Sequence, residues 1–222
     1  MKRNRTLLAT TVAAALAGCG AGTDAETPGF AVLDAHYTYA LPRDFCPASE
    51  EWRKGFAPVA AQNRDKAILV QLVDCVENAK YVNSPNYILL GTMSDKARVP
   101  LTKEGLFRDF KADVDEAQFR KLVDSGASFA DLKRAEAETP GREAEVSPDL
   151  FPHSSDGTCL FTGGRYGSDT SNPERSATVI NCRASVDGHQ IFVMHNGDGK
   201  QDLLAMARRV GALVRSIKRV AE

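Results

Sequence analysis

Histidine and serine are the side chains left to act as a base, a nucleophile or a metal ligand if the cysteines of this sequence form disulfides. His189 and His195 are six residues apart on one predicted strand and share a face, but a rise of about 3.3 Å per residue places them roughly 20 Å apart. They cannot bind one metal ion. His36 and His153 are isolated, and Ser154–Gly157 lacks the strand-turn-helix context of a catalytic serine. The residues therefore predict no catalytic site and favour a protein that is not an enzyme.

Two glycine-containing segments resemble ion-binding loops. Thr162–Gly167 is glycine-rich, but it lacks the Lys-Ser/Thr ending of a nucleotide loop and opens no predicted helix. In Asn196–Lys200, Lys200 occupies a calcium-ligand position and Ala207 stands where the bidentate glutamate belongs. We expect a wide hairpin turn in the first segment and a turn leading into a helix in the second. No cofactor and no metal is predicted at either.

Contact with a partner protein is predicted on the long turn that we expect from Gly164 to Arg175. Arg165 and Tyr166 lie there, and Arg and Tyr are favoured at protein interfaces. The last predicted helix also carries Arg208, Arg215, Lys218 and Arg219. These cations could contact lipid headgroups or an acidic partner, but a solvated face that complements the helix dipole is the favoured interpretation.

The first residues have the composition of an export signal. Lys2, Arg3 and Arg5 precede an uncharged run from Thr6 to Ala17, which ends at small residues and Cys19. A membrane-spanning helix needs roughly 20 apolar residues, and this run is too short and too diluted by threonine and alanine. The pattern predicts that residues 1–18 are removed during export.

Leu16-Ala17-Gly18-Cys19 resembles the lipobox of bacterial lipoproteins. The resemblance implies that Cys19 receives a diacylglyceryl group, that cleavage precedes it, and that its new amino group is acylated, with palmitate as an expected acyl chain. Two or three chains anchor a protein without spanning the membrane. Position 20 carries Gly20 rather than the aspartate that resembles an inner-membrane retention signal. This implies that the protein lies at the periplasmic face of the outer membrane. The alternative is an ordinary signal peptide with a coincidental cysteine.

The other four cysteines predict disulfides. An even number of cysteines in an exported chain indicates pairing, because the periplasm is oxidising. Of the three possible connectivities we favour Cys46 with Cys75 and Cys159 with Cys182, since the second pair falls opposite in a predicted hairpin. Zinc is the alternative, but no Cys-x-x-Cys and no paired histidines at ligand spacing support it.

The charge balance excludes one class of partner. Lys and Arg total 28 against 29 Asp and Glu, and removal of the signal takes away three of the basic residues. A net negative chain offers no electrostatic footprint for nucleic acid. The expected partners are the membrane, through lipid at Cys19, and a periplasmic protein.

Hydrophobic periodicity outlines the elements. Residues 19–29 are small and polar and predict a flexible tether. Alternation predicts one strand over Phe30–Leu41, and helical spacing follows over Pro47–Asn63, with Ser49 as N-cap and a kink or break at Pro58. Dense apolar runs predict a central strand at Lys66–Val76 and a neighbouring strand at Asn86–Met93.

In the second half of the sequence, the period of the hydrophobic pattern changes twice. Thr102–Glu138 predicts two or three short helices, with a stop at Gly126 and a capping box from Ser128 to Asp131. The acidic, proline-rich residues 139–156 predict a loop. Strands follow at 158–163, 176–185 and 189–195, the last two joined by a turn at Asp187-Gly188, and an amphipathic helix is predicted at Gln201–Val220.

This order predicts a single α+β domain over residues 30–222. It has a mostly antiparallel sheet with a strand meander, an inserted set of short helices and an amphipathic C-terminal helix. The order of elements in the last third resembles the PsbP-like periplasmic α+β folds. The expected function is that of a lipid-anchored binding or inhibitor module. A cell-envelope hydrolase and a carrier of small ligands or lipids are the alternatives.

Overall fold

A computed structural model describes residues 27–62, 66–78, 85–93, 100–139, 149–167 and 172–221. The predicted signal, Cys19 and most of the predicted tether lie outside the described residues. Within the described part of the chain, no helix combines the length and apolar character needed to cross a bilayer.

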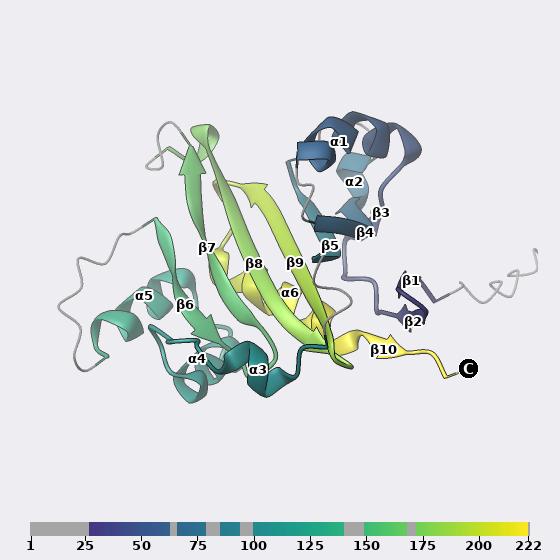
Figure 1. Cartoon of the computed structure of the whole chain (residues 1–222). Coiled ribbons are helices and arrows are strands. Elements are labelled where there is room, and N and C mark those ends of the chain that lie inside the picture. The colour runs from purple at the N-terminus through teal and green to yellow at the C-terminus, as the bar shows by residue number, and fades with distance from the viewer. Residues whose placement is uncertain are drawn as a thin grey trace, which may run out of the picture.

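The centre of the molecule is a seven-stranded sheet in which every neighbouring pair is antiparallel (Figure 1). In spatial order its strands are β3 (Phe45–Pro47), β4 (Lys66–Asp74), β5 (Tyr87–Met93), β9 (His189–Asp198), β8 (Ser176–Val186), β7 (Leu160–Gly167) and β6 (Leu150–Ser155). The β8–β9 turn has left-handed φ angles of 48° at Asp187 and 81° at Gly188, as a two-residue hairpin turn requires. The predicted α+β class, antiparallel sheet and meander are confirmed.

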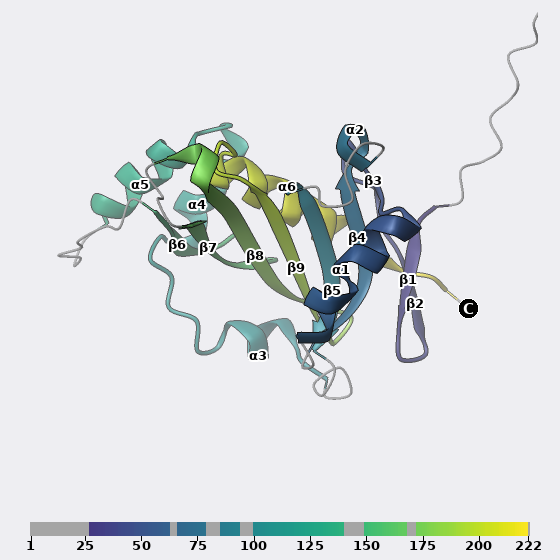
Figure 2. The same cartoon turned by 90° about the horizontal axis from the view of Figure 1, so that it is seen from above.

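Helices lie on both faces of this sheet. They are α1 (Glu50–Gln62), α2 (Cys75–Asn78), α3 (Lys103–Phe107), α4 (Glu116–Asp124), α5 (Phe129–Ala137), the 3-10 turn η1 (Pro173–Arg175) and α6 (Leu203–Ser216). Figure 2 shows α6 on one face and α1 and α3 on the other. α4 and α5 pack against β6 and α6 at the β6 side of the sheet.

Local capping explains where several helices begin and end. Ser49 Oγ accepts from Trp52 N–H at the start of α1, which is one helix despite Pro58. Ser128 and Asp131 form the predicted capping box of α5. Gly126 has a φ of 71° just after α4, so it ends that helix in the conformation that glycine adopts without strain.

The C-terminal helix is shorter than predicted. Asp202 caps α6 by accepting from Ala205 N–H, and the helix ends at Ser216. Ile217 is extended and buried, and Lys218–Arg219 form strand β10, which pairs with β2. The sheet hydrogen bonds to β2 and the burial of Ile217 therefore outweigh continuation of the helix, and Lys218 and Arg219 do not belong to a helical basic face.

The strand predicted over Phe30–Leu41 is instead a hairpin. β1 (Gly29–Val32) and β2 (Ala35–Thr38) pair in antiparallel fashion, and with β10 they form a three-stranded sheet. The turn places Leu33 at a φ of 54°. Val32 and Ala35 both point inward although they are three positions apart, and this change of parity is the sequence signal of the turn.

Two further boundaries differ from prediction. The predicted loop at 139–156 contains the edge strand β6, where the register shifts between Phe151 and Ser154, around Pro152. Proline lacks an N–H donor and is tolerated at such edges and bulges. β4 ends at Asp74 and lies second from the edge of the sheet, because the chain turns at Cys75 into α2.

The apolar residues form two clusters on opposite faces of the sheet. The larger lies between the sheet and α6 and includes Leu72, Ile88, Ile180, Val193, Leu204 and Met206, all at 0% exposure. The smaller lies under α1, where the Trp52 ring stacks on Phe56 at 4.9 Å and contacts Tyr87 at 5.5 Å. α1 covers only the β3–β4–β5 side of its face.

Candidate binding surface

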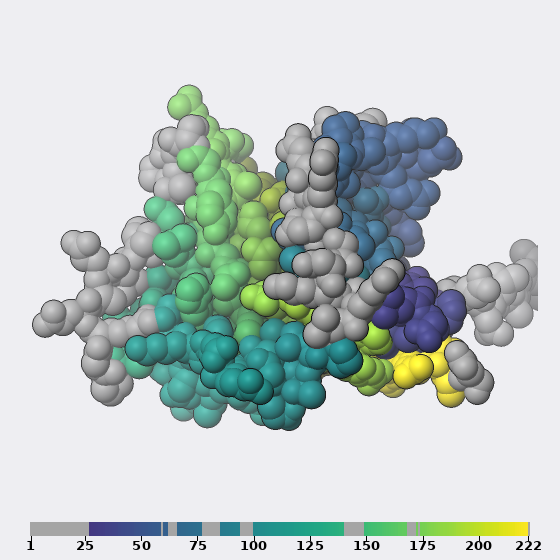
Figure 3. Space-filling model, in the orientation of Figure 1, coloured from purple at the N-terminus to yellow at the C-terminus, as the bar shows by residue number. Residues whose placement is uncertain are grey.

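Part of the sheet face that carries α1 and α3 is not covered by any helix or strand among the described residues. We call this region of β4, β5 and β7–β9 the open face, and its residues are Lys66, Met93, Thr162, Asn181, Arg183, Gln190, Phe192 and Met194. All of these except Met194 line a hollow of about 370 Å³. Figure 3 shows this side of the molecule, with β7 and β8 at the surface above α3.

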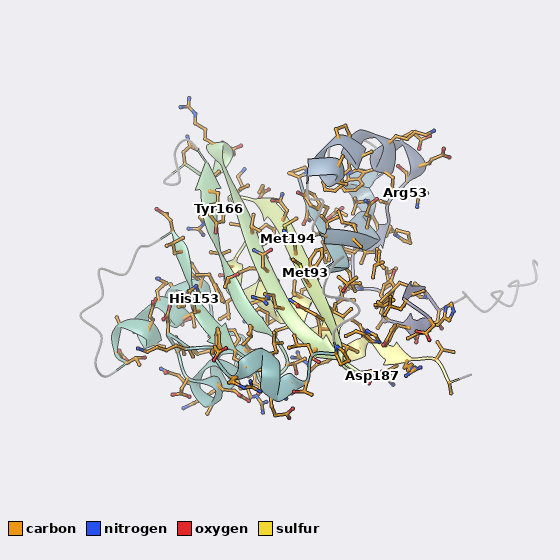
Figure 4. All side chains as sticks on the ribbon, in the orientation of Figure 1. Arg53, Met93, His153, Tyr166, Asp187 and Met194 are labelled. Atoms are coloured by element: carbon orange, nitrogen blue, oxygen red, sulfur yellow. A yellow bond between two sulfur atoms is a disulfide. The ribbon has the colours of Figure 1, made fainter. Side chains whose placement is uncertain are left out.

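Strand register aligns these side chains in rows. Asn181 is the Cα partner of both Thr162 and Met194, and Arg183 is the partner of Phe192. Paired residues point to the same face of a sheet. Figure 4 shows Met93 and Met194 on this side, in the middle of the view. The row of Thr162, Asn181 and Met194 therefore places a hydroxyl, an amide and a thioether side by side.

Phe192 is positioned by a glycine. Gly91 is its partner on β5, and a Cβ at Gly91 would lie 2.7 Å from the Phe192 ring. Only glycine lets the ring lie over the strand in this way. The Nζ of Lys66 is 5.7 Å from the ring centroid, so an ammonium lies over the aromatic ring.

Two cations on the open face form no ion pair with the described residues. Lys66 and Arg183 are both exposed. Among the described residues, neither has a carboxylate within ion-pair distance, whereas Lys54, Arg120 and Lys133 elsewhere all do. Unlike those three cations, Lys66 and Arg183 are available to an acidic group from outside the molecule.

A second hollow of about 400 Å³ adjoins the first, since Arg183 and Gln190 line both. Its other lining residues are Leu101, Gly105, Leu106, Asp109, Phe110 and Leu160, from α3, its flanks and β7. α3 is held there because Leu101 N–H donates to Gly188 O at 2.7 Å and Ser185 Oγ donates to Leu101 O. Because the two hollows share Arg183 and Gln190, we call them together the groove.

The predicted partner residues Arg165 and Tyr166 are not in a turn. Residues 164–167 belong to β7, because a Cβ at Gly163 would lie 2.2 Å from Val179 O and one at Gly164 would lie 2.6 Å from Asp149 O. These glycines serve close strand packing. Tyr166 is 49% exposed, on the open-face side of β7, whereas Arg165 points to the other side, 5.8 Å from the Phe129 ring.

The histidines do not form a site together. His195 is fully buried on the α6 side, where its Nε2 is 3.1 Å from Asn86 Oδ1 and its ring packs edge-on to Phe45. Burial, and to a smaller extent the nearby Arg209, lower the pKa of His195 to about 3, so the ring is neutral. In the described part of the chain, no three His, Cys, Asp or Glu side chains come together as metal ligands.

Both predicted disulfides are present. Cys46 is bonded to Cys75 and Cys159 to Cys182, with Cα–Cα distances of 5.0 and 5.2 Å. Cys182 lies opposite Phe161 rather than Cys159, so the second bond runs diagonally from the residue just before β7. The sequential connectivity is confirmed, although the pair is not directly opposite as predicted.

Prediction from the sequence missed the open-face cations and Phe192. A signal existed, because Arg183 alternates with buried Cys182 and Ala184 in β8. That alternation shows that Arg183 faces away from the core. It does not show that the second face stays uncovered.

No family model matches this sequence, and no curated protein matches it either. The molecule is therefore defined by its own geometry: an α+β domain with two disulfides and a basic, partly apolar groove on one face of its sheet.

Proposed function

We propose that this chain is a membrane-anchored binding module whose open face binds a periplasmic protein partner. The observation that carries the proposal is the groove, where exposed Lys66 and Arg183 flank half-buried Phe192. Interfaces are enriched in aromatic residues, methionine and arginine, and all three occur together here. Tyr166 extends the same surface along β7.

The anchor is part of the same proposal. Cys19, after a basic and apolar leader, is the expected lipidation site, and the periplasmic face of the outer membrane is the expected location. Two disulfides fit an oxidising compartment. Replacing Cys19 with Ser should move the protein from the membrane fraction to the soluble fraction of the envelope, without changing its disulfides in non-reducing mass spectrometry. An unchanged membrane fraction would contradict lipidation at Cys19.

The groove favours a protein partner over the two alternatives. A carrier of lipids or small ligands calls for a large enclosed apolar cavity, but both hollows mix polar and apolar residues and open to solvent. A hydrolase needs several titratable groups that converge in its pocket, and the described lining of the two hollows holds one carboxylate, Asp109, and no histidine. The buried histidine, His195, lies on the opposite face of the sheet from the groove.

Site-specific crosslinking in intact cells tests the binding surface. A photoreactive amino acid at Asn181 on the open face should yield a discrete crosslinked protein. The same group at Arg53, which is exposed on α1 and away from the groove (Figure 4), is the matched control and should not yield it. Equal crosslinking from both positions, or none from Asn181, would overturn the assignment of this face.

A further inference from the structure

We infer that the occupant of the groove is an extended peptide segment whose inward side chains run in the order carboxylate, apolar, carboxylate. The inference rests on the proposed function and adds the chemistry of the partner. It follows from three features of the open face: the charges that it leaves unpaired, the distance between them, and the apolar surface that separates them.

The first feature is charge. Arg183 on β8 and Lys66 on β4 are exposed. Among the described residues, no carboxylate lies within ion-pair distance of either. Asp109 lines the second hollow together with Arg183, but no ion pair joins these two side chains. A basic pair that forms no ion pair with the described residues is complementary to acidic side chains, and arginine binds carboxylates with two parallel hydrogen bonds.

The second feature is spacing. Strands β4 and β8 are separated by β5 and β9, so three strand intervals of about 4.8 Å and an offset of two residues along the strands place the Cα atoms of Lys66 and Arg183 roughly 16 Å apart. The Lys66 side chain extends inward, to 5.7 Å from the Phe192 ring centroid. In an extended peptide, residues i and i+4 are about 13 Å apart and point to the same side. Two acidic residues at this spacing therefore reach both cations at once.

The third feature lies between the cations. Phe192 of β9 lies over Gly91 of β5, on the two strands between Lys66 and Arg183, and Met93 and Met194 lie on the same face. The residue at i+2 of an extended peptide points the same way as i and i+4, so an apolar side chain there lands on the Phe192 ring. Asn181 and Thr162 offer hydrogen-bonding groups to the peptide backbone.

The size of the groove also fits a short peptide. From β4 to β7 it crosses four strand intervals, about 19 Å, which corresponds to about six extended residues. A single acyl chain would meet the polar groups of Thr162, Asn181 and Gln190 along this path, and burying these without hydrogen bonds is unfavourable.

Fluorescence anisotropy with synthetic peptides tests the inference on the full-length chain in detergent. The probe is labelled Ser-Glu-Val-Phe-Val-Glu-Ser. Its first control replaces both glutamates with glutamine, and its second has the same composition in the order Ser-Val-Phe-Glu-Glu-Val-Ser. We expect saturable binding of the probe. Each control peptide should bind more weakly than the probe, by about tenfold or more.

Protein variants complete the test. Lys66→Glu and Arg183→Glu should each weaken probe binding by about tenfold, whereas Arg53→Glu, the same charge change on α1, should leave it unchanged. Circular dichroism of each variant establishes that it is folded.

Equal binding of the glutamine peptide, no loss in the Arg183→Glu variant, or no saturable binding of the probe would overturn the inference. The crosslink at Asn181 distinguishes this from failure of the proposed function. If that crosslink persists while the charge dependence is absent, the open face still binds a partner, but one of different chemistry.

Discussion

Cys182 and Val193 are fully buried beneath α6, whereas Arg183 and Phe192, their neighbours in the same two strands, are exposed and half-buried on the other face. Neighbouring residues of a strand point to opposite faces, so one pair of strands carries both environments. The difference lies in the helices. α6 covers β7, β8 and β9, while α1 and α3 leave that part of the second face open.

This comparison separates stability from recognition. Apolar surface that is buried on the α6 face contributes about 25 cal/mol of stabilisation per Å², and the residues of this face serve packing. The open face keeps Phe192 and Met194 only partly covered and surrounds them with polar and charged groups. Residues on the first face should therefore control unfolding, and residues on the second should control binding.

The largest effect is expected on the α6 face. Phe161 is 1% exposed, and its ring centroid lies 5.4 Å from that of Phe119. Phe161→Ala leaves a cavity under α6 and should lower the free energy of unfolding by about 3–5 kcal/mol, measured by urea denaturation. A loss below about 1 kcal/mol would show that this face is not the stabilising core.

The sequence predicted most of the elements, because their signals are local. The capping box at Ser128, the stop at Gly126 and the turn at Asp187-Gly188 each depend on a few adjacent residues. Boundaries that depend on distant partners were wrong. Gly163 and Gly164 were predicted to lie in a turn. The residues next to them in the sequence do not reveal that the backbone oxygens of Val179 and Asp149 lie close to these glycines.

The open face itself could not be predicted, for a similar reason. Alternation in β8 separates Cys182 from Arg183, but it does not tell which face a helix will cover. That depends on where α1 and α3 pack, and hence on contacts between segments far apart in sequence. Arg165 and Tyr166 illustrate this, because adjacent residues proposed as one contact lie on opposite faces.

A second prediction concerns pH and again the α6 face. The folded-state pKa of His195 is about 3, against 6.5 for a free histidine, so the unfolded chain binds the proton first as pH falls. Above about pH 6.5, protonation of this residue therefore does not lower the free energy of unfolding. Between about pH 6.5 and pH 3 it lowers that free energy by up to about 1.4 kcal/mol per pH unit.

Between pH 7 and pH 5 the wild type should lose about 2 kcal/mol more than His195→Gln, measured by urea denaturation at each pH. The control is His36→Gln, at an exposed position on β2, which should follow the wild type. Parallel losses in the wild type and His195→Gln would show that this histidine is not buried as a neutral ring.

The smallest effect on stability is expected from Phe192→Ala, which makes the same chemical change as Phe161→Ala on the opposite face. The Phe192 ring is half-buried and has solvent on one side, so its loss should lower the free energy of unfolding by about 1 kcal/mol or less. The same variant should weaken binding of the glutamate probe, because it removes the apolar surface between Lys66 and Arg183. If Phe192→Ala instead unfolds the protein as readily as Phe161→Ala, the second face is also a packed core, and the separation of stability from recognition fails.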